Sequence, residues 1–168
     1  MKKEENYGIF SAMEFASYIK YKFNELKPNV QNISPLKLQK SLYFCFAYWG
    51  AFAYKGNKAK NEISNQRFDE YLFNDEIEAW VYGPVVPTVY RNSDKIEICN
   101  PEEMFEGKEY VRDFIDGVLE DVLNASDFRL VNISHEDQCW KKHFHQDDDF
   151  HEEEIPKEEI IKEYVNQI

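Results

Sequence analysis

The residues best suited to chemistry are histidines and one cysteine in the C-terminal third of the chain. Cys139, His143 and His145 follow a C-x3-H-x-H spacing, and His135 or His151 is available as a fourth ligand. Thiolate and imidazole groups bind structural zinc, but closed zinc sites combine two regularly spaced ligand pairs, which this run does not provide. Histidine is ordinary in an acidic, polar surface region. We therefore expect no metal and no cofactor.

His135 is the histidine with the clearest alternative roles. As a general base working with an acid it would make the protein a hydrolase. No nucleophile with a defined partner accompanies it, so we favour a structural role, tying a helix start to the central helix or to a Gly-Pro connector. Glu76 and Glu78 share a face of a predicted strand, and an exposed strand face explains them more simply than a catalytic pair. The sequence therefore does not predict an enzyme.

The element that must position these groups is a connector over residues 76–87. It contains a short strand-like run followed by Gly83-Pro84 and Pro87. Each proline restricts the residue before it to extended conformations, so Gly83 and Val86 are expected to be extended. The prolines also lack an N–H donor. A rigid, hydrophobic connector of this kind can fix two helical layers or present a surface to a partner.

The two N-terminal helices are signalled by their caps. Ser11 and Glu14 form a capping box, and residues 10 and 15 are placed as a hydrophobic staple, for a helix that ends at Pro28. The second helix begins at Ser34-Pro35, an N-cap followed by proline, and runs to about residue 54. From residue 42 onward it is apolar almost all round, which is typical of a central helix. Lys37 and Lys40 are interpreted as surface lysines whose stems cover apolar neighbours, in preference to a ligand role.

The remaining segments follow from periodicity and turn residues. The first predicted elements are a surface loop (55–70), a hairpin (72–81, with Asn74-Asp75 as its turn), a short helix (88–91) and an irregular segment (92–107). A strongly periodic helix (111–123) and a short helix after Ser126, ending near Asn132, follow. Ser134 and Asp137 suggest the N-cap of a helix that carries Trp140 and Phe144, before an acidic loop (145–154) and a last helix with Pro156 at its first position. The prediction is a mainly α, compact single-domain helical bundle around a central apolar helix with a small β-hairpin. Residues 1–9 are expected to be a flexible lead-in, and residues 10–168 the domain.

Composition narrows the class of partner. The 168 residues carry a formal net charge of −12, from 32 acidic and 20 basic side chains. This disfavours binding to a phosphate backbone, which requires Lys and Arg, and favours a basic partner. Residues 136–163 hold eleven acids against four lysines, either as a solvated face or as a face for a basic protein. Three widely spaced cysteines, no signal peptide and no membrane-length apolar run predict a cytoplasmic protein.

Aromatic side chains are abundant enough to serve both the core and an interface. The chain contains thirteen Phe, eleven Tyr and three Trp. Tyrosine and tryptophan suit interfaces because one end is apolar and the other polar. We expect most of them in the core and a minority exposed near Gly83-Pro84, from the set Tyr43, Tyr48, Trp49, Trp80, Tyr82, Tyr90 and Trp140.

Four segments together resemble one known family. Residues 34–44 (SPLKLQKSLYF) resemble the "isplkLqKLlYfa" segment of the Panacea (SocA-like) antitoxin domain. Residues 78–87 (EAWVYGPVVP) with Tyr90 resemble its "eaW-yGPVvp-vY" segment. Residues 133–140 are similar to its "lTH-e-pW" segment, and residues 155–164 to its closing helix. Ser134 stands where Thr is usual, Gln138-Cys139 where Pro often precedes the Trp, and the loop over 55–70 is longer than typical.

The resemblance implies a helical protein that is not an enzyme and that neutralises a cognate toxin by direct binding, in one branch by delivering it to a protease. The alternative is a phage- or prophage-encoded protein that binds and inhibits or redirects a host or defence protein. A protein partner is expected in both cases, with no nucleic acid and no membrane. The expected partner-binding residues are Lys37, Lys40, Tyr43, Trp80, Tyr82, Gly83, Pro84, Val85 and Tyr90. The expected structural residues are Ser34, Pro35, His135 and Trp140.

Overall fold

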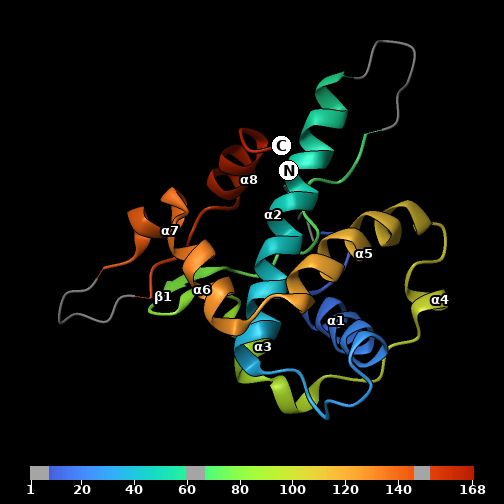
Figure 1. Cartoon of the computed structure of the whole chain (residues 1–168). Helices are drawn as coiled ribbons and strands as arrows, with labels where there is room; N and C mark the ends of the chain where they lie inside the picture. Colours follow the sequence, from blue (N-terminus) through green and yellow to red (C-terminus); the bar gives the residue numbers. More distant parts are fainter. Residues whose placement is uncertain (1–7, 60–66, 146–151) are drawn as a thin grey trace, which may run out of the picture.

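The computed structural model describes residues 8–59, 67–145 and 152–168. Within these ranges the chain forms eight α-helices, one short 3-10 helix and a two-stranded antiparallel sheet, packed as one compact domain (Figure 1). The predicted fold class is therefore confirmed. None of the helices in the described ranges is long and apolar enough to cross a membrane.

Helix α2 (Pro35–Ala59) is the central element, as predicted. It contacts α1 (Ala12–Leu26), α3 (Pro87–Arg91), α5 (Glu109–Asn124), α6 (Asp127–His135) and α8 (Lys157–Val165), as well as strand β2 (Gly83–Val85). Figure 1 shows it passing between α5 on one side and α6 and α8 on the other. Its all-round apolar surface is explained by these neighbours, because each side of the helix buries against a different element.

The second half of α2 is longer than the sequence predicted. Residues 55–59, expected to belong to a loop, continue the helix. Lys55, Lys58 and Ala59 are good helix formers, and Lys58 lies in the last turn, where a cation complements the helix dipole. The returning chain is joined to the helix by Asn57, whose side-chain amide pairs with both the N–H and the C=O of Phe68. Residues 60–66 of the predicted loop lie outside the described ranges.

Helix α1 begins where its capping box predicted. The Ser11 hydroxyl accepts from the Glu14 N–H, and the Glu14 carboxylate accepts from the Ser11 N–H. The rings of Phe10 and Phe15 stack with centroids 6.2 Å apart, as expected for a hydrophobic staple. The helix ends at Leu26, two residues before Pro28.

The hairpin lies later in the chain than predicted. Strand β1 (Glu78–Trp80) pairs with β2, and Val81-Tyr82 form the turn in place of Asn74-Asp75. Residues 71 and 72 instead accept backbone hydrogen bonds from residues 9 and 10. The Asp75 carboxylate accepts from the Ala12 N–H at the start of α1. Asp75, which was predicted to lie in the turn, instead bonds to the first turn of α1. The predicted pairing of residues 72–73 with residues 77–81 is therefore wrong.

The segment over 92–107 is more regular than predicted. It contains a 3-10 helix (Ser93–Lys95) and α4 (Pro101–Met104). The Asn100 side chain accepts from the Glu103 N–H, and Pro101 occupies the first helical position. This short helix therefore has the N-cap and proline signals of a longer one.

The C-terminal helices confirm the predicted elements and correct their limits. Helix α5 buries most of its predicted apolar stripe, with Phe114 and Val118 half-buried, and Ser126 caps α6. Helix α6 runs past Asn132 to His135, so the prediction of Ser134 as an N-cap is wrong. Ser134 lies inside α6 and its hydroxyl donates to the Val131 C=O. The next helix, α7 (Gln138–His143), has Asp137 at its N-cap position, and Pro156 is the N-cap residue of α8, not its first helical residue.

Candidate partner-binding site

The connector forms a hairpin whose second strand begins with a glycine of unusual conformation. Gly83 has φ +109°, a region that other residues rarely adopt. A Cβ atom at this position would lie 2.5 Å from the Ser134 Oγ and 2.9 Å from the Lys40 Cε. Proline at residue 84 predicted an extended glycine, and the structure shows a strand residue with positive φ. Only glycine allows α2 and α6 to approach the hairpin this closely.

Three side chains from three different helices hydrogen bond to carbonyl groups of the hairpin. The Trp140 Nε1 donates to the Trp80 O at 2.9 Å, from α7. The His135 Nε2 contacts the Val81 O at 3.0 Å, from the end of α6. The Lys40 Nζ donates to the Pro84 O at 2.8 Å, from α2. The hairpin is therefore held in place by side chains that lie far from it in sequence.

Gln39 provides a fourth attachment that the sequence analysis missed. Its Oε1 accepts from the Val86 N–H at 2.8 Å, and its Nε2 donates to the Val86 O at 3.3 Å. The side-chain amide therefore pairs with both backbone groups of Val86, as a neighbouring strand would. The available signal was a glutamine at the start of an otherwise apolar helix, next to Lys40.

Lys40 is buried, so its interpretation as a surface lysine is wrong. It is 1% exposed, and no carboxylate pairs with it among the residues that the structure describes. Burial lowers the pKa of Lys40 to about 7 because the charged form loses its hydration. The hydrogen bond to the Pro84 O satisfies one of its donors, and either the amine or the ammonium form can make that bond.

His135 has the contacts of a structural residue. Its ring stacks on Trp140 with centroids 4.1 Å apart. Since a carbonyl oxygen can only accept, the Nε2 must carry the proton that is donated to the Val81 O. Burial lowers the pKa of His135, against the opposing effect of this hydrogen bond. Within the described residues, no hydrogen bond joins His135 to a hydroxyl or thiol that could act as a nucleophile.

The start of α2 is joined to α6 at the surface. The Ser34 hydroxyl accepts from the Lys37 N–H and donates to the Asp127 carboxylate at 2.6 Å. The Lys37 Nζ lies 3.5 Å from the other oxygen of Asp127. Pro35 is the first residue of α2. Ser34 and Lys37 therefore fix the first turn of α2 against the start of α6.

The expected partner-binding residues divide into buried and accessible groups. Tyr82 and Tyr90 are 63% and 55% exposed, Trp80 is half-buried, and Lys37 is half-buried in its contact with Asp127. The neighbouring turn residue Val81, which was not in the predicted set, is 59% exposed. The buried members of the set are Lys40, Tyr43, Gly83, Pro84 and Val85. These five can support a contact surface but cannot themselves touch a partner in this conformation.

We call Trp80, Val81, Tyr82 and Tyr90 the hairpin-tip patch. The Trp80 and Tyr90 rings meet edge to face with centroids 5.1 Å apart. The Trp80 Nε1 donates to the Glu78 carboxylate at 3.0 Å. The patch thus combines the tip of a hairpin, whose backbone is held by hydrogen bonds from α2, α6 and α7, with an exposed tyrosine of α3. A backbone that is already held reduces the conformational entropy that binding would cost.

The potential metal ligands lie in two separate groups. Among the described residues, the side chains close enough to share an ion are Asp137, Cys139 and Glu163. Burial raises the pKa of the Cys139 thiol to about 12, so the thiolate that a metal requires is disfavoured. His143 and His145 contact Glu153 instead of Cys139. The structure therefore does not bring Cys139, His143 and His145 into one ligand set, and His151 lies outside the described residues.

Asp137 and Glu163 each have a structural role. The Asp137 carboxylate accepts from the hydroxyls of Tyr43 at 2.5 Å and Tyr164 at 2.6 Å, deep in the core. Asp137 stands at the N-cap position of α7, but its side chain makes no capping hydrogen bond to that helix. Glu163, from α8, takes that role and accepts from the N–H groups of Gln138 and Cys139 at 2.9 and 2.8 Å. The start of α7 thus depends on a side chain of α8.

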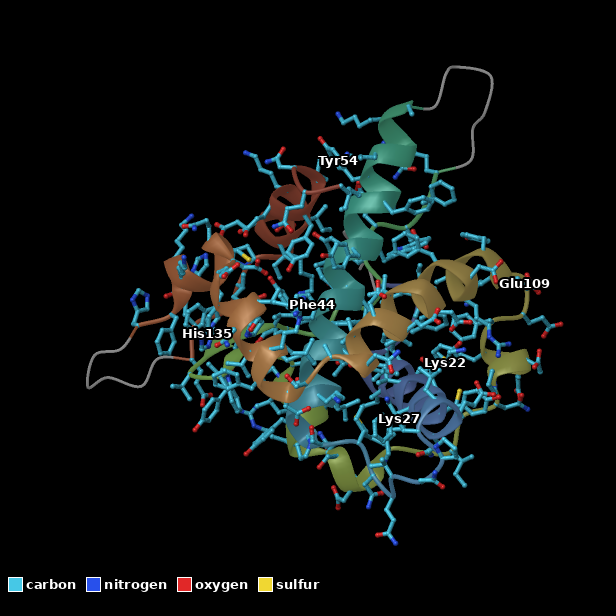
Figure 2. All side chains as sticks on the ribbon, in the orientation of Figure 1. Lys22, Lys27, Phe44, Tyr54, Glu109 and His135 are labelled. Carbon is cyan, nitrogen blue, oxygen red and sulfur yellow. The ribbon has the colours of Figure 1, made fainter. Side chains whose placement is uncertain are left out.

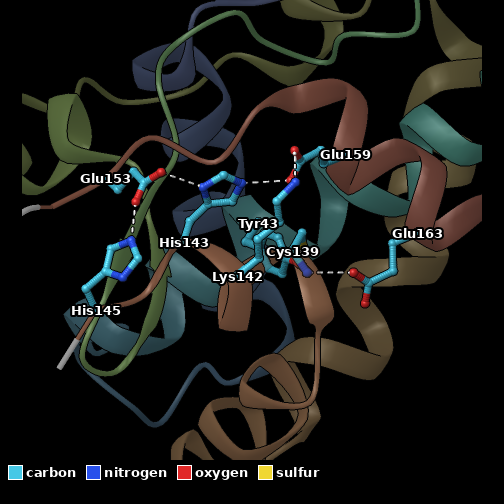
Figure 3. A network of polar contacts seen from close by, with 8 residues as sticks. All are labelled: Tyr43, Cys139, Lys142, His143, His145, Glu153, Glu159 and Glu163. Atoms are coloured by element: carbon cyan, nitrogen blue, oxygen red, sulfur yellow. Dashed lines mark hydrogen bonds and ion pairs between the residues drawn. The ribbon is translucent and has the colours of Figure 1, made fainter.

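A charged network joins α7 to the following segment and to α8 (Figure 3). The His143 ring lies between two carboxylates, with Nδ1 2.8 Å from Glu153 and Nε2 2.8 Å from Glu159. His145 contacts the second oxygen of Glu153, and Lys142 contacts Glu159. Burial alone would lower the pKa of His143, but the two carboxylates outweigh it and raise the pKa. Both ring nitrogens of His143 therefore contact carboxylates, and the network links α7 to α8 and to residue 153 through ion pairs.

The comparison with protein families identifies the segment that contains most of this site. Residues 60–141, just under half of the chain, match the family described as "Antitoxin SocA-like, Panacea domain". The match includes the hairpin, α5, α6 and Trp140, whereas the motifs in α2 and α8 lie outside it. Searches among curated proteins and among solved structures found no match. The resemblance to the SocA-like Panacea antitoxin family, predicted from the sequence, is thereby confirmed for residues 60–141.

Proposed function

We propose that this chain is an antitoxin-like protein that binds a cognate protein toxin directly and neutralises it through the hairpin-tip patch. The family match supports an antitoxin-like role in general. The observation that supports the contact surface is the exposure of Val81 and Tyr82 on a hairpin fixed by Lys40, His135 and Trp140, with the exposed Tyr90 of α3 beside Trp80. Tyrosine and tryptophan are the residue types that most often dominate interface energies.

Charge favours a basic toxin. The net charge of −12 would increase the rate of encounter with a basic protein and discourage association between copies of this chain. The aromatic patch would then supply the short-range contacts. In this mechanism the chain occludes the active surface of the toxin, and its own residues carry out no reaction.

The test is rescue of growth. A neighbouring gene product that inhibits growth is co-expressed with the wild-type chain, with a Tyr82→Ser/Tyr90→Ser variant, or with an Ile98→Ser control. Ile98 is fully exposed and lies outside the hairpin-tip patch. We expect rescue by the wild type and the control, and loss of rescue by the double variant at equal protein level.

Two additional measurements separate the alternative functions. If no neighbouring product inhibits growth, and affinity purification from infected cells recovers a host or defence protein through the same tyrosines, the chain redirects a host protein instead. If rescue disappears in a host without its ATP-dependent proteases, the chain acts as an adaptor for proteolysis. If the double variant still rescues fully, the hairpin-tip patch is not the toxin-binding surface.

A further inference from the structure

A second surface, separate from the hairpin tip, is a groove between α2, α5 and α6. It has a volume of about 660 Å³. Its apolar lining is supplied by Phe44, Tyr48, Phe114, Val118, Leu130 and Ile133. Figure 2 shows Phe44 near the centre of the molecule, where α5 and α6 approach α2. Tyr48, Phe114 and Val118 are only half-buried, and Ile133 is 38% exposed, so the groove is open to solvent.

The glycine in the wall of this groove has no role in the fold that the structure reveals. Gly117 lies in the middle of α5, and a Cβ atom there would meet nothing within 4 Å. It is not among the glycines with positive φ. Glycine inside a helix costs roughly 1 kcal/mol relative to alanine. Glycine at this position therefore makes α5 less stable than alanine would. It also leaves open space in the groove wall, into which the backbone or a side chain of a partner could fit.

Charged groups flank that open space on both walls. Asp113 and Asp121 lie one turn before and one turn after Gly117 on α5, about 12 Å apart along the helix axis. Arg129 lies on the opposite wall, from α6. Among the residues that the structure describes, none of these three side chains forms an ion pair. The groove thus presents two acids on one edge and a base on the other, with an apolar floor.

The Tyr48 hydroxyl adds a polar group to the floor. Its ring packs edge to face on Tyr164, with centroids 4.9 Å apart, but its hydroxyl has no hydrogen-bond partner among the described residues. Burial raises the pKa of Tyr48, so the hydroxyl stays protonated and can donate to a bound segment.

From this arrangement we propose that the groove binds an amphipathic helix of a protein partner. Its apolar face would pack on the accessible side chains Phe114, Val118 and Ile133, and its backbone would approach α5 at Gly117. Two basic residues, two turns apart, would face Asp113 and Asp121, and an acidic residue would face Arg129. This inference deepens the proposed function and depends on it only for the protein nature of the partner.

A synthetic peptide tests the groove without a toxin. The probe is a fluorescently labelled helical peptide of about five turns, with Leu at i, i+3, i+4 and i+7, two Lys residues two turns apart on one edge, and Glu on the other. A second peptide has the same Leu residues and the charges exchanged. We expect the first peptide to bind the full chain, measured by anisotropy, and the second to bind about tenfold or more weakly.

Variants of α5 locate the binding. Gly117→Leu would fill the groove wall, so we expect at least a tenfold loss of affinity while the melting temperature is unchanged or higher. Asp121→Lys would repel the first peptide and strengthen binding of the second. Glu120→Lys, on the next residue outside the groove, makes the same charge change and should leave peptide preference nearly unchanged. Equal binding of the first peptide by the wild type and Gly117→Leu, or no binding by the wild type, would overturn the proposal.

Two further outcomes have defined meanings. Concentration-dependent dimerisation of the wild type that Gly117→Leu abolishes would make a second copy of this chain the occupant, and the proposal would be wrong. Selective peptide binding combined with failure to rescue growth against any neighbouring product would refute the proposed antitoxin function while leaving the groove as a helix-binding site.

Discussion

The hairpin and the groove make opposite use of a glycine. At Gly83 the surrounding atoms leave no room for a Cβ, and the backbone has a conformation that favours glycine. At Gly117 the surroundings are empty and the backbone is ordinary helix. The first glycine is required for folding, whereas the second lowers stability without a packing benefit. The fold explains the first glycine but not the second, and this is why Gly117 supports the proposed binding role of the groove.

The two regions also differ in how they are held. The hairpin is fixed by directional hydrogen bonds from Gln39, Lys40, His135 and Trp140 to its backbone. The groove is bounded by helices that pack through apolar side chains, and its own polar groups remain unpaired among the described residues. Substitutions of the residues that hold the hairpin backbone should therefore mainly affect stability, and substitutions that fill or recharge the groove should mainly affect binding.

The largest effect is expected for Gly83→Ala. The added Cβ would meet Ser134 and Lys40, and alanine is strained at φ +109°. We expect a loss of about 2–4 kcal/mol in the free energy of unfolding, measured by urea denaturation. Gly107→Ala is the control, because Gly107 has φ +73° but open surroundings. If both variants lose the same stability, the close approach of α2 and α6 contributes nothing.

The next largest loss in the free energy of unfolding is expected for Lys40→Met. The Pro84 O would lose its buried partner, at a cost of about 1–3 kcal/mol near pH 7. The sign of the pH effect follows from the lowered pKa. Above pH 7 the folded state releases the Lys40 proton while the unfolded state keeps it up to about pH 10.4. The unfolded state then binds more protons, so wild-type stability should rise with pH in this window.

The test of that sign is the slope, not the absolute stability. Denaturation at several pH values between 7 and 10 should show a smaller rise for Lys40→Met than for the wild type. Parallel pH profiles for the two proteins would show that Lys40 keeps an ordinary pKa.

Gly117→Ala should give a small gain, in contrast to Gly83→Ala. Replacing an exposed glycine in a helix interior is expected to stabilise the fold by roughly 0.5–1 kcal/mol. Thermal unfolding followed by circular dichroism measures it. A loss of stability would mean that the open space at Gly117 is needed for the packing of α5, and the contrast between the two glycines would disappear.

The smallest effect is expected for His143→Gln, which leaves both regions in place. Because the pKa of His143 is raised in the folded state, its contribution to the free energy of unfolding is fully present below about pH 6.5. That contribution is lost as the pH rises through the folded-state pKa. The lowered pKa values of Glu153 and Glu159 mean that theirs is lost as pH falls below about 4.5. The free energy of unfolding of the wild type, measured by urea denaturation, should therefore exceed that of the variant most between about pH 4.5 and pH 6.5. An unchanged difference at pH 8.5 would argue against an ionised His143.

Local signals predicted the helices well. The capping box of α1, the proline at the start of α2 and the apolar stripe of α5 each depend on residues within a few positions of one another. For the same reason the family resemblance could be recognised from short segments. The limits of α6 and α7 were wrong because Ser134 looks like a cap locally, whereas it lies inside α6 and its hydroxyl donates to the Val131 C=O of the same helix. Asp137 does stand at the N-cap position of α7, but its side chain bonds to Tyr43 and Tyr164 in the core.

The hairpin register and the burial of Lys40 could not be predicted in this way. The turn Val81-Tyr82 has no turn-forming residue of its own, and it is fixed by side chains from α6 and α7. A lysine on an apolar helix has the same local sequence whether it meets water or the Pro84 O. The sequence signal for the groove was Gly117, a glycine in the middle of the most clearly periodic helix of the chain.

Because Glu163 caps α7, and α7 carries Trp140, the support of the hairpin depends on a residue near the end of the chain. Trp140 can hold the Trp80 carbonyl only if α7 is formed, and the first N–H groups of α7 are satisfied by a side chain made more than twenty residues later. On a ribosome, a nascent chain that has not reached residue 163 therefore carries the aromatic hairpin without this support. A chain that ends before residue 163 would therefore leave the first N–H groups of α7 uncapped, and we expect its hairpin to be less firmly held than in the full chain.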